Sequence, residues 1–198
     1  MHLKNKLWQY TVVVATSGVV AAFLQAQPRF QDPDSFYHTR IVVTMIQHGL
    51  ITRFPWLQYT DLATSFTDHH LLYHLLLMPF VGLLTPVIGV KVFQALSIVG
   101  LATYLFHRLQ RWQAPHALAA MVVLFGVMPF LLRIQLVKAS VLAILVLLFI
   151  LFNLLEKRYL RVCVAVTLYT WLHAGFILAL LVAGVVWLVE TGMVSRAA

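Results

Sequence analysis

The chain has 198 residues, of which 62% are hydrophobic and only 10% are charged, and its mean hydropathy is +0.89. Soluble domains carry roughly 25% charged residues, so this composition excludes an ordinary soluble protein and indicates lipid as the solvent. The formal charge of +8 comes from 14 Lys and Arg against six acids. These basic residues gather at the ends of apolar runs, which indicates membrane edges and argues against a nucleic-acid partner.

The first apolar run, Leu7–Leu24, follows Lys4 and Lys6. It is longer than the apolar region of a signal peptide, which has about 7–15 residues. We therefore expect an uncleaved first span with the N-terminus in the cytoplasm, and a cleaved signal peptide is the alternative. Either interpretation exports residues 25–88, which form a long first extracytoplasmic loop.

This loop is expected to carry two amphipathic helices on the membrane surface, near residues 35–48 and 69–84. Asp34 suits the N-cap of the first helix and Gly49 suits its end. The second apolar run is short and contains Pro79, and such runs of about 10–14 residues are more often interfacial than spanning. The alternative is a full span from Leu71 to Ile88, which would invert every later segment.

The later apolar runs predict the remaining spans at residues 89–106, 117–132 and 139–155. Residues 162–189 favour two short or tilted spans with a break near His173. The predicted fold is therefore all-α: a single polytopic membrane domain over residues 1–198, with about six transmembrane helices, most simply in a prokaryotic plasma membrane. In this topology the cytoplasmic basic residues are Lys4, Lys6, Arg108, Arg111, Lys157, Arg158, Arg161 and Arg196.

Residues that can exchange protons or bind metals are concentrated in the first loop. It holds all four aspartates and five of the nine histidines. The aspartates are Asp32, Asp34, Asp61 and Asp68, and the histidines are His38, His48, His69, His70 and His74. This asymmetry is the main functional signal in the sequence. The single Cys163 leaves no intrachain disulfide.

Several of these residues have both a structural and a functional interpretation. His70 and His74 are four residues apart, so they share one helix face and could bind zinc with Asp68. The segment lacks the glutamate of the H-E-x-x-H signature. The alternatives to a zinc site are that these histidines contact the substrate, or that they only form the water-exposed edge of a helix. Arg133 and Lys138 lie on the outer side of their spans, where they either hold a lipid phosphate or extend along helix ends. His173 is a weaker candidate, as a polar group in an apolar stretch.

The segment Asp34-Ser-Phe-Tyr-His-Thr-Arg40 resembles the first-loop motif of GT-C membrane glycosyltransferases. It is most similar to the catalytic subunits of archaeal and bacterial oligosaccharyltransferases, and more loosely to the dolichyl-phosphate-mannose and lipid A aminoarabinose transferases. The order of spans and loops also fits this family over most of the chain. The motif itself covers only about residues 30–75.

The resemblance implies a sugar transferase that uses a polyprenyl-phosphate-linked donor, with membrane lipids around it. It places the catalytic aspartate at Asp34, as a general base or as a ligand of Mg²⁺ or Mn²⁺, with Asp32 as second choice and Asp68 in support. The substrate-binding residues would be His38, Arg40, His69, His70, His74, Arg133 and Lys138.

Two departures from the family keep other functions open. The loop Arg133-Ile-Gln-Leu-Val-Lys138 lacks the second acidic motif of the oligosaccharyltransferases, and this absence favours a metal-independent transferase. The second departure is length, because members of the family are usually much longer. A non-catalytic scaffold, or a split module completed by a second chain, is the alternative. A small transporter ranks third, because the spans contain almost no ionisable pairs.

Overall fold

The structure is a computed structural model that describes residues 2–55 and 57–197. The side chains of Lys4, Lys6 and Arg196 lie outside the described residues. The part of the chain described is helical throughout, without strands, which confirms the all-α prediction. Its elements are α1 (His2–Gln25), α2 (Pro33–His48), a 3₁₀ turn η1 (Asp61–Ala63), α3 (Leu71–Leu83), α4 (Pro86–Arg111), α5 (Ala117–Gly126), α6 (Met128–Ile134), α7 (Ser140–Leu155), α8 (Tyr159–Leu172) and α9 (Ile177–Ala197).

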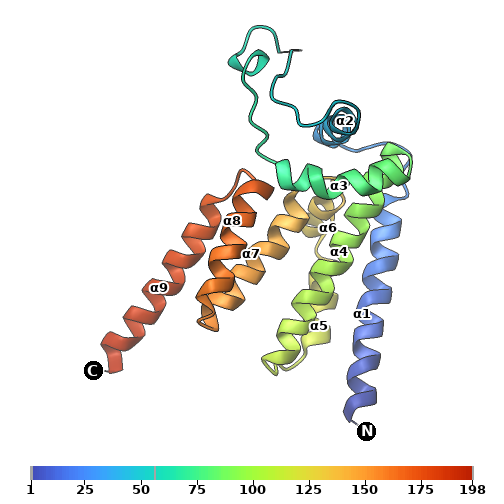
Figure 1. The fold of residues 1–198 in the computed structure, drawn as a ribbon. Coiled ribbons are helices and arrows are strands. Elements are labelled where there is room, and N and C mark those ends of the chain that lie inside the picture. The colour runs from blue at the N-terminus through green and yellow to red at the C-terminus, as the bar shows by residue number, and fades with distance from the viewer. Residues whose placement is uncertain (1, 56, 198) are drawn as a thin grey trace.

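Helices α1, α4, α5, α7, α8 and α9 run alternately in opposite directions, and the two termini lie at the same end of the bundle (Figure 1). Helix α4 is central, because it packs against α1, α3, α5 and α7. Many of the outward-facing side chains of the bundle are exposed and apolar, such as Leu180 and Trp187. An apolar exterior of this kind fits a lipid environment.

Only two of the described helices are long and apolar enough to cross a membrane, and these are Leu7–Gln25 and α4. The pair α5 and α6 would count as a third, but it is bent by 77°. The apolar helices α3, α7, α8 and Ile177–Gly192 within α9 are shorter. By length and composition, two or three of the described helices could therefore span a membrane, which is fewer than the predicted number of about six.

The bend between α5 and α6 has a local cause. Pro129 stands in the first turn of α6; its ring removes a backbone donor and would clash with the carbonyl of Phe125 if one helix continued. Val127 accordingly takes an extended conformation between the two helices, with φ −85° and ψ 110°. The predicted single span over residues 117–132 is wrong in this respect.

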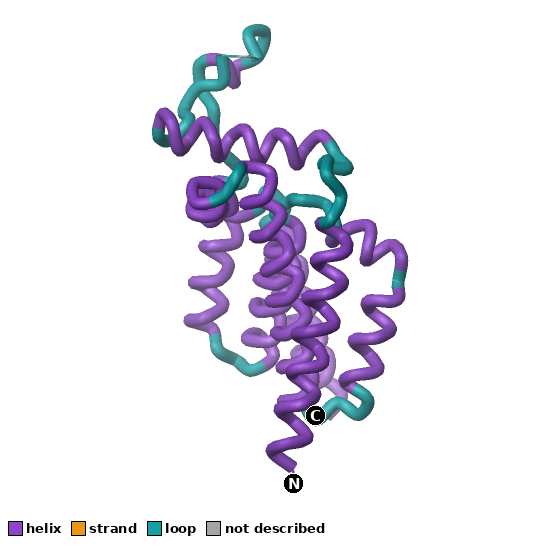
Figure 2. Tube along the Cα trace, turned by 90° about the vertical axis from the view of Figure 1, so that its right-hand side faces the viewer, coloured by secondary structure: helices purple, strands orange, loops and turns teal. Residues whose placement is uncertain are grey.

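Helices α2 and α3 lie across one end of the bundle, which we call the capped end (Figures 1 and 2). Two helices are thus present where the sequence predicts them, with bounds of 33–48 and 71–83. A continuous span from Leu71 to Ile88 is wrong, since the chain leaves the helix at Leu84 and restarts at Pro86. Tyr73 and Leu77 of α3 are fully buried in the core beneath it.

The opposite end of the bundle carries a charge cluster, and we call it the basic end. Glu156, between α7 and α8, accepts a hydrogen bond from Arg108 and lies 3.2 Å from Nε of Arg158 and 3.7 Å from Nε of Arg111. Arg108 is buried and its guanidinium carbon lies 4.7 Å from the ring centroid of Phe152. This cluster joins the end of α4 to the α7–α8 turn.

Candidate functional site

The first turn of α2 forms ion pairs with the linker between α6 and α7. Nζ of Lys138 lies 2.7 Å from Oδ2 of Asp34 and 3.0 Å from Oδ2 of Asp32. The hydroxyl of Ser35 donates to Asp32 and lies 3.3 Å from the carbonyl oxygen of Val137. Two segments a hundred residues apart in sequence therefore meet at this point.

The helix cap differs from the prediction. Asp32, with φ −143° and ψ 154°, occupies the N-cap position, whereas Asp34 lies within the first turn after Pro33. The N-cap assigned to Asp34 is wrong, because proline is favoured at the first helical position and moves the start of the helix two residues earlier. Gly49 does end the helix as predicted, and its φ of +80° is a backbone conformation that glycine adopts without steric cost.

Lys138 and Asp34 shift each other's pKa. The hydrogen bond from Lys138 lowers the pKa of Asp34 below the usual value, and nearby positive charge adds to that effect. Burial alone would lower the pKa of Lys138, but its bonds to Asp34 and Asp32 outweigh burial and raise that pKa. The ion pair of Asp34 and Lys138 therefore stays charged at neutral pH, and two carboxyl groups face one ammonium in this trio.

A second group of side chains forms a hydrogen-bonded chain that we call the Asp68–His74–His38 relay. Nδ1 of His74 lies 2.6 Å from Oδ2 of Asp68, and Nε2 of His74 lies 2.8 Å from Nδ1 of His38. The other carboxylate oxygen of Asp68 accepts the backbone N–H of His70 at 2.9 Å. His74 is fully buried and His38 nearly so, which isolates the relay from bulk water.

The relay keeps Asp68 ionised and His38 neutral. Burial raises the pKa of Asp68, but its hydrogen bonds with His74 and the backbone of His70 outweigh burial and leave the pKa lowered. Burial lowers the pKa of His38 to about 3, helped by the adjacent His74 and His70 and opposed by Asp34 and Asp68. His74 links the neutral imidazole of His38 to the Asp68 carboxylate and so provides a path for a proton, although a pKa of about 3 makes His38 itself a weak base at neutral pH.

The α8–α9 turn completes the surroundings of the relay. Nδ1 of His70 donates to the carbonyl of Leu172 at 3.2 Å, and the His70 and His173 ring centroids are 5.5 Å apart. Nδ1 of His173 is buried without a hydrogen-bond partner among the described residues. Sequence reasoning ranked His173 as a weak candidate, because nothing local in the sequence shows that it meets His70.

Not every predicted site residue joins these groups. His69 is exposed on the loop and Arg133 is exposed in the last turn of α6. Arg40 lies on the outer face of α2, in a groove of about 380 Å³. The other residues that line this groove are Phe36, Tyr37, Ile41, Thr44 and Phe54. Tyr37 connects the groove to the relay, since its ring centroid is 5.4 Å from that of His38.

Sequence reasoning missed two side chains next to the site. Ser35 ties Asp32 to Val137, and Tyr73 is fully buried, with its ring centroid 5.2 Å from that of His38 and no hydrogen-bond partner for its hydroxyl among the described residues. The helical spacing of Ser35, His38, Val42 and Met45 is the signal that marks the buried face of α2.

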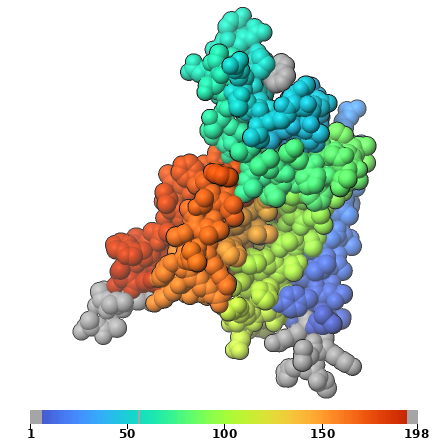
Figure 3. Space-filling view, viewed as in Figure 1, coloured from blue at the N-terminus to red at the C-terminus, as the bar shows by residue number. Residues whose placement is uncertain are grey.

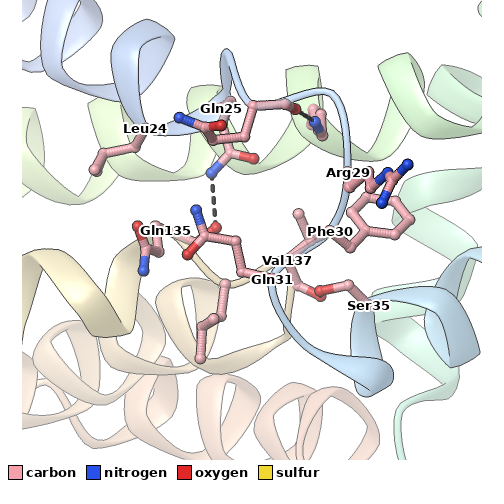
Figure 4. Close-up of a pocket in the computed structure, with 11 residues that line it drawn as sticks. Leu24, Gln25, Arg29, Phe30, Gln31, Ser35, Gln135 and Val137 are labelled. Atoms are coloured by element: carbon pink, nitrogen blue, oxygen red, sulfur yellow. Dashed lines mark hydrogen bonds between the residues drawn. The ribbon is translucent and has the colours of Figure 1, made fainter.

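A small polar pocket lies beside this site, between the α1–α2 linker and the α6–α7 linker (Figure 4). Nε2 of Gln25 donates to the backbone carbonyl of Gln135 at 2.8 Å, and Lys91 donates to the carbonyl of Gln27 (Figure 4). The volume of about 10 Å³ is enough for about one water molecule. The residues around this pocket connect the two linkers, and the pocket is too small for a sugar or a phosphate.

The residues present do not fit a metal ion. Lys138 already neutralises one of the two carboxylate charges at Asp32 and Asp34 and occupies the space between them. Both ring nitrogens of His74 are engaged, by Asp68 and by His38, so they cannot also bind zinc. Over the described residues, no group of three or more His, Cys, Asp or Glu side chains has the geometry of a metal site.

Comparison of this chain with models of known protein families, with curated proteins and with solved structures finds no match.

Proposed function

We propose that this chain is a membrane glycosyltransferase of the GT-C type, or the N-terminal module of one, that acts on the extracytoplasmic side. It would transfer a sugar from a polyprenyl-phosphate-linked donor. The observation that carries the proposal is the buried Asp68–His74–His38 relay at the capped end, beside the groove that contains Arg40. A proton acceptor next to a partly aromatic groove with a cation suits an amphipathic donor with a phosphate.

The relay offers a route for the proton of the acceptor nucleophile. The Asp68 carboxylate fixes the proton of His74 on Nδ1, so Nε2 of His74 accepts from Nδ1–H of His38. Nε2 of His38 is then the free acceptor. When it takes the nucleophile's proton, the Nδ1 proton of His38 passes to His74. The positive charge then lies on His74, against Asp68, where it is stabilised.

This proton transfer accompanies substitution at the anomeric carbon of the donor sugar. A bond forms between that carbon and the acceptor atom, the bond to the phosphate oxygen breaks, and the polyprenyl phosphate departs with the bonding electron pair. Arg40 is better suited than Lys138 to the departing phosphate, because Lys138 is already paired with Asp32 and Asp34. A role for Asp34 as general base stays a prediction. Its lowered pKa makes it a weak base, as the pKa of about 3 does for His38, but the Asp34 carboxylate already accepts a hydrogen bond from Lys138.

Transfer assays with single variants separate these roles. The purified chain in lipid nanodiscs would be given radiolabelled hexoses on undecaprenyl phosphate, and release of the hexose to water or to an acceptor would be measured. We expect His38→Asn to lower the rate by about 100-fold or more, as loss of general-base catalysis does. The control His48→Asn changes an exposed histidine at the end of α2 and should leave the rate unchanged.

Equal rates for His38→Asn and the unsubstituted chain would exclude the relay as the base. If Asp34→Asn alone abolished transfer, the base would be Asp34 and the sequence-based assignment would hold. For the phosphate, Arg40→Gln should weaken binding of undecaprenyl phosphate but not of undecaprenol, which lacks the charge. The matched control is Arg53→Gln, in the exposed loop.

A non-catalytic scaffold is the second candidate function. The observation in its favour is that α9 is exposed and apolar around much of its surface, so a further membrane chain could cover it. Transfer by the purified chain alone would exclude the scaffold. Transfer that appears only after a second membrane chain is added would support a split enzyme.

A further inference from the structure

A groove on the side of the bundle lies between α7 and α8, away from the candidate site. Its volume is about 460 Å³. The apolar residues that line it are Leu145, Val146 and Phe149 of α7 and Leu160, Val164, Ala165 and Leu168 of α8. Arg161 is its one charged lining residue. Several of these apolar side chains are well exposed, with Leu160 at 80%, and Figure 3 shows α8 uncovered on this face.

The position of Arg161 sets the polarity of the groove. It lies in the first turn of α8, next to the α7–α8 turn, so the charged mouth of the groove is at the basic end and the apolar part extends toward the capped end (Figure 1). A ligand that fills the groove must therefore have a polar head at one end and an apolar chain along the helices.

The charge at the basic end selects an anion for that head. Arg108, Arg111 and Arg158 share the single carboxylate of Glu156. Arg161 and Lys157 make no ion pair with any residue that the structure describes, so their charges are uncompensated. A lone arginine at the mouth of an apolar groove is electrostatically complementary to a lipid phosphate.

We propose that this groove binds an anionic phospholipid from the leaflet at the basic end, with an acyl chain between α7 and α8 and the phosphate on Arg161. Lys157 adds a second positive charge near the headgroup. The occupant is an ordinary membrane phospholipid and not the polyprenyl-linked donor, because the groove opens at the end opposite α2 and α3. This inference is independent of the proposed transferase activity.

Native mass spectrometry of the full chain can test the proposal. The protein would be released from detergent with equal amounts of phosphatidylglycerol and phosphatidylcholine that carry the same acyl chains. We expect one phosphatidylglycerol to be retained in preference, and Arg161→Gln to weaken its retention about fivefold, the usual contribution of one basic residue at a membrane surface. Arg53→Gln, at the capped end, should leave retention unchanged.

A second variant probes the groove without changing charge. Val164→Trp places a bulky ring on an exposed position of the groove wall and should also reduce retention, whereas Val123→Trp, on exposed α5, should not. Equal retention of the two phospholipids would overturn the proposal, and so would equal effects of Arg161→Gln and Arg53→Gln. If undecaprenyl phosphate displaced phosphatidylglycerol in a way that depended on Arg161, the groove would bind the polyprenyl lipid instead. If the chain were a dimer that Val164→Trp dissociated, the groove would bind a second copy of the chain.

Discussion

At the scale of single residues, the capped end holds two polar groups with different properties. The Lys138 trio is half-exposed, with side-chain exposures of 22% for Lys138, 12% for Asp32 and 61% for Asp34. The Asp68–His74 pair is buried, at 8% and 0%. Charges in the first group are partly screened by water, whereas those in the relay interact strongly. Substitutions in the two groups should therefore affect stability and pH dependence differently.

Acid should destabilise the protein through His38. Its pKa is about 3 in the folded chain against 6.5 for the free side chain, so the unfolded state binds more protons between these values. The free energy of unfolding therefore falls as the pH drops from about 6.5 toward 3, by up to about 1.4 kcal/mol for each unit of pKa difference. His38→Asn should give a shallower acid limb in thermal unfolding measured against pH.

The control for this measurement is Gln47→Asn, which changes an exposed side chain of α2 that does not titrate, so its acid limb should match that of the unsubstituted chain. Asp68 and Asp34 have lowered pKa values, so their stabilisation is lost only at lower pH, below about 4. An acid limb that His38→Asn leaves unaltered above pH 4 would show that His38 is accessible to protons in the folded state.

Removing the charge of Lys138 should lower the free energy of unfolding more than removing the charge of its exposed partner Asp34. Lys138→Met leaves the half-buried Asp32 close to Asp34 without a counter-charge, and we expect a loss of about 1–3 kcal/mol. Asp34→Asn keeps the pair of Lys138 with Asp32, so the loss should stay below about 1 kcal/mol. The two variants would be compared by thermal unfolding in the same detergent. Equal losses of stability would mean that Lys138 stabilises the fold through Asp34 alone.

At the scale of elements, the turn between α3 and α4 sets how the capped end meets the bundle. Gly89, in the first turn of α4, lies against the backbone of α3, where an added Cβ would be 2.5 Å from the carbonyl oxygen of Phe80 and 2.8 Å from the amide nitrogen of Val81. Only glycine allows this approach. The close contact holds α3, and with it His74, across the end of the bundle.

Gly89→Ala should therefore destabilise the fold by about 1–3 kcal/mol, because backbone must move to accept the methyl group. The matched control is Gly100→Ala in the same helix, where the nearest atom outside the helix is Cδ1 of Leu145 at an ordinary 3.6 Å. That change should stabilise by up to about 1 kcal/mol through helix propensity. If both variants unfolded at the same temperature, the close approach of α3 and α4 would be wrong.

At the scale of the whole molecule, alternating helices place the α7–α8 turn and the capped end at opposite ends of the bundle (Figure 1). Yet α7 has 16 residues and α8 has 14, so at 1.5 Å per residue they fall short of the roughly 30 Å hydrocarbon core. Local thinning of the bilayer and flanking basic side chains can accommodate such short helices. The topology thus depends on whether these helices cross.

Cysteine labelling from one side of the membrane would decide this. With Cys163→Ala as background, Tyr59→Cys in the exposed loop should react with an impermeant maleimide from one side only. Lys157→Cys in the α7–α8 turn and Gln113→Cys in the α4–α5 turn should react only from the other side. If Lys157→Cys were labelled from the same side as Tyr59→Cys, α7 and α8 would form a re-entrant hairpin.

The helical class, the positions of α2 and α3 along the chain, and the concentration of aspartates and histidines between α1 and α4 follow from the sequence, because hydropathy, proline and glycine act locally along the chain. The bend between α5 and α6 also has a local cause in Pro129. The lengths of α7 and α8 could not be predicted, because the ends of these helices depend on packing as well as composition. The candidate site itself depends on tertiary packing. The bonds from His38 to His74 and from Lys138 to Asp34 join segments 36 and 104 residues apart, and contacts over such separations depend on how the helices pack.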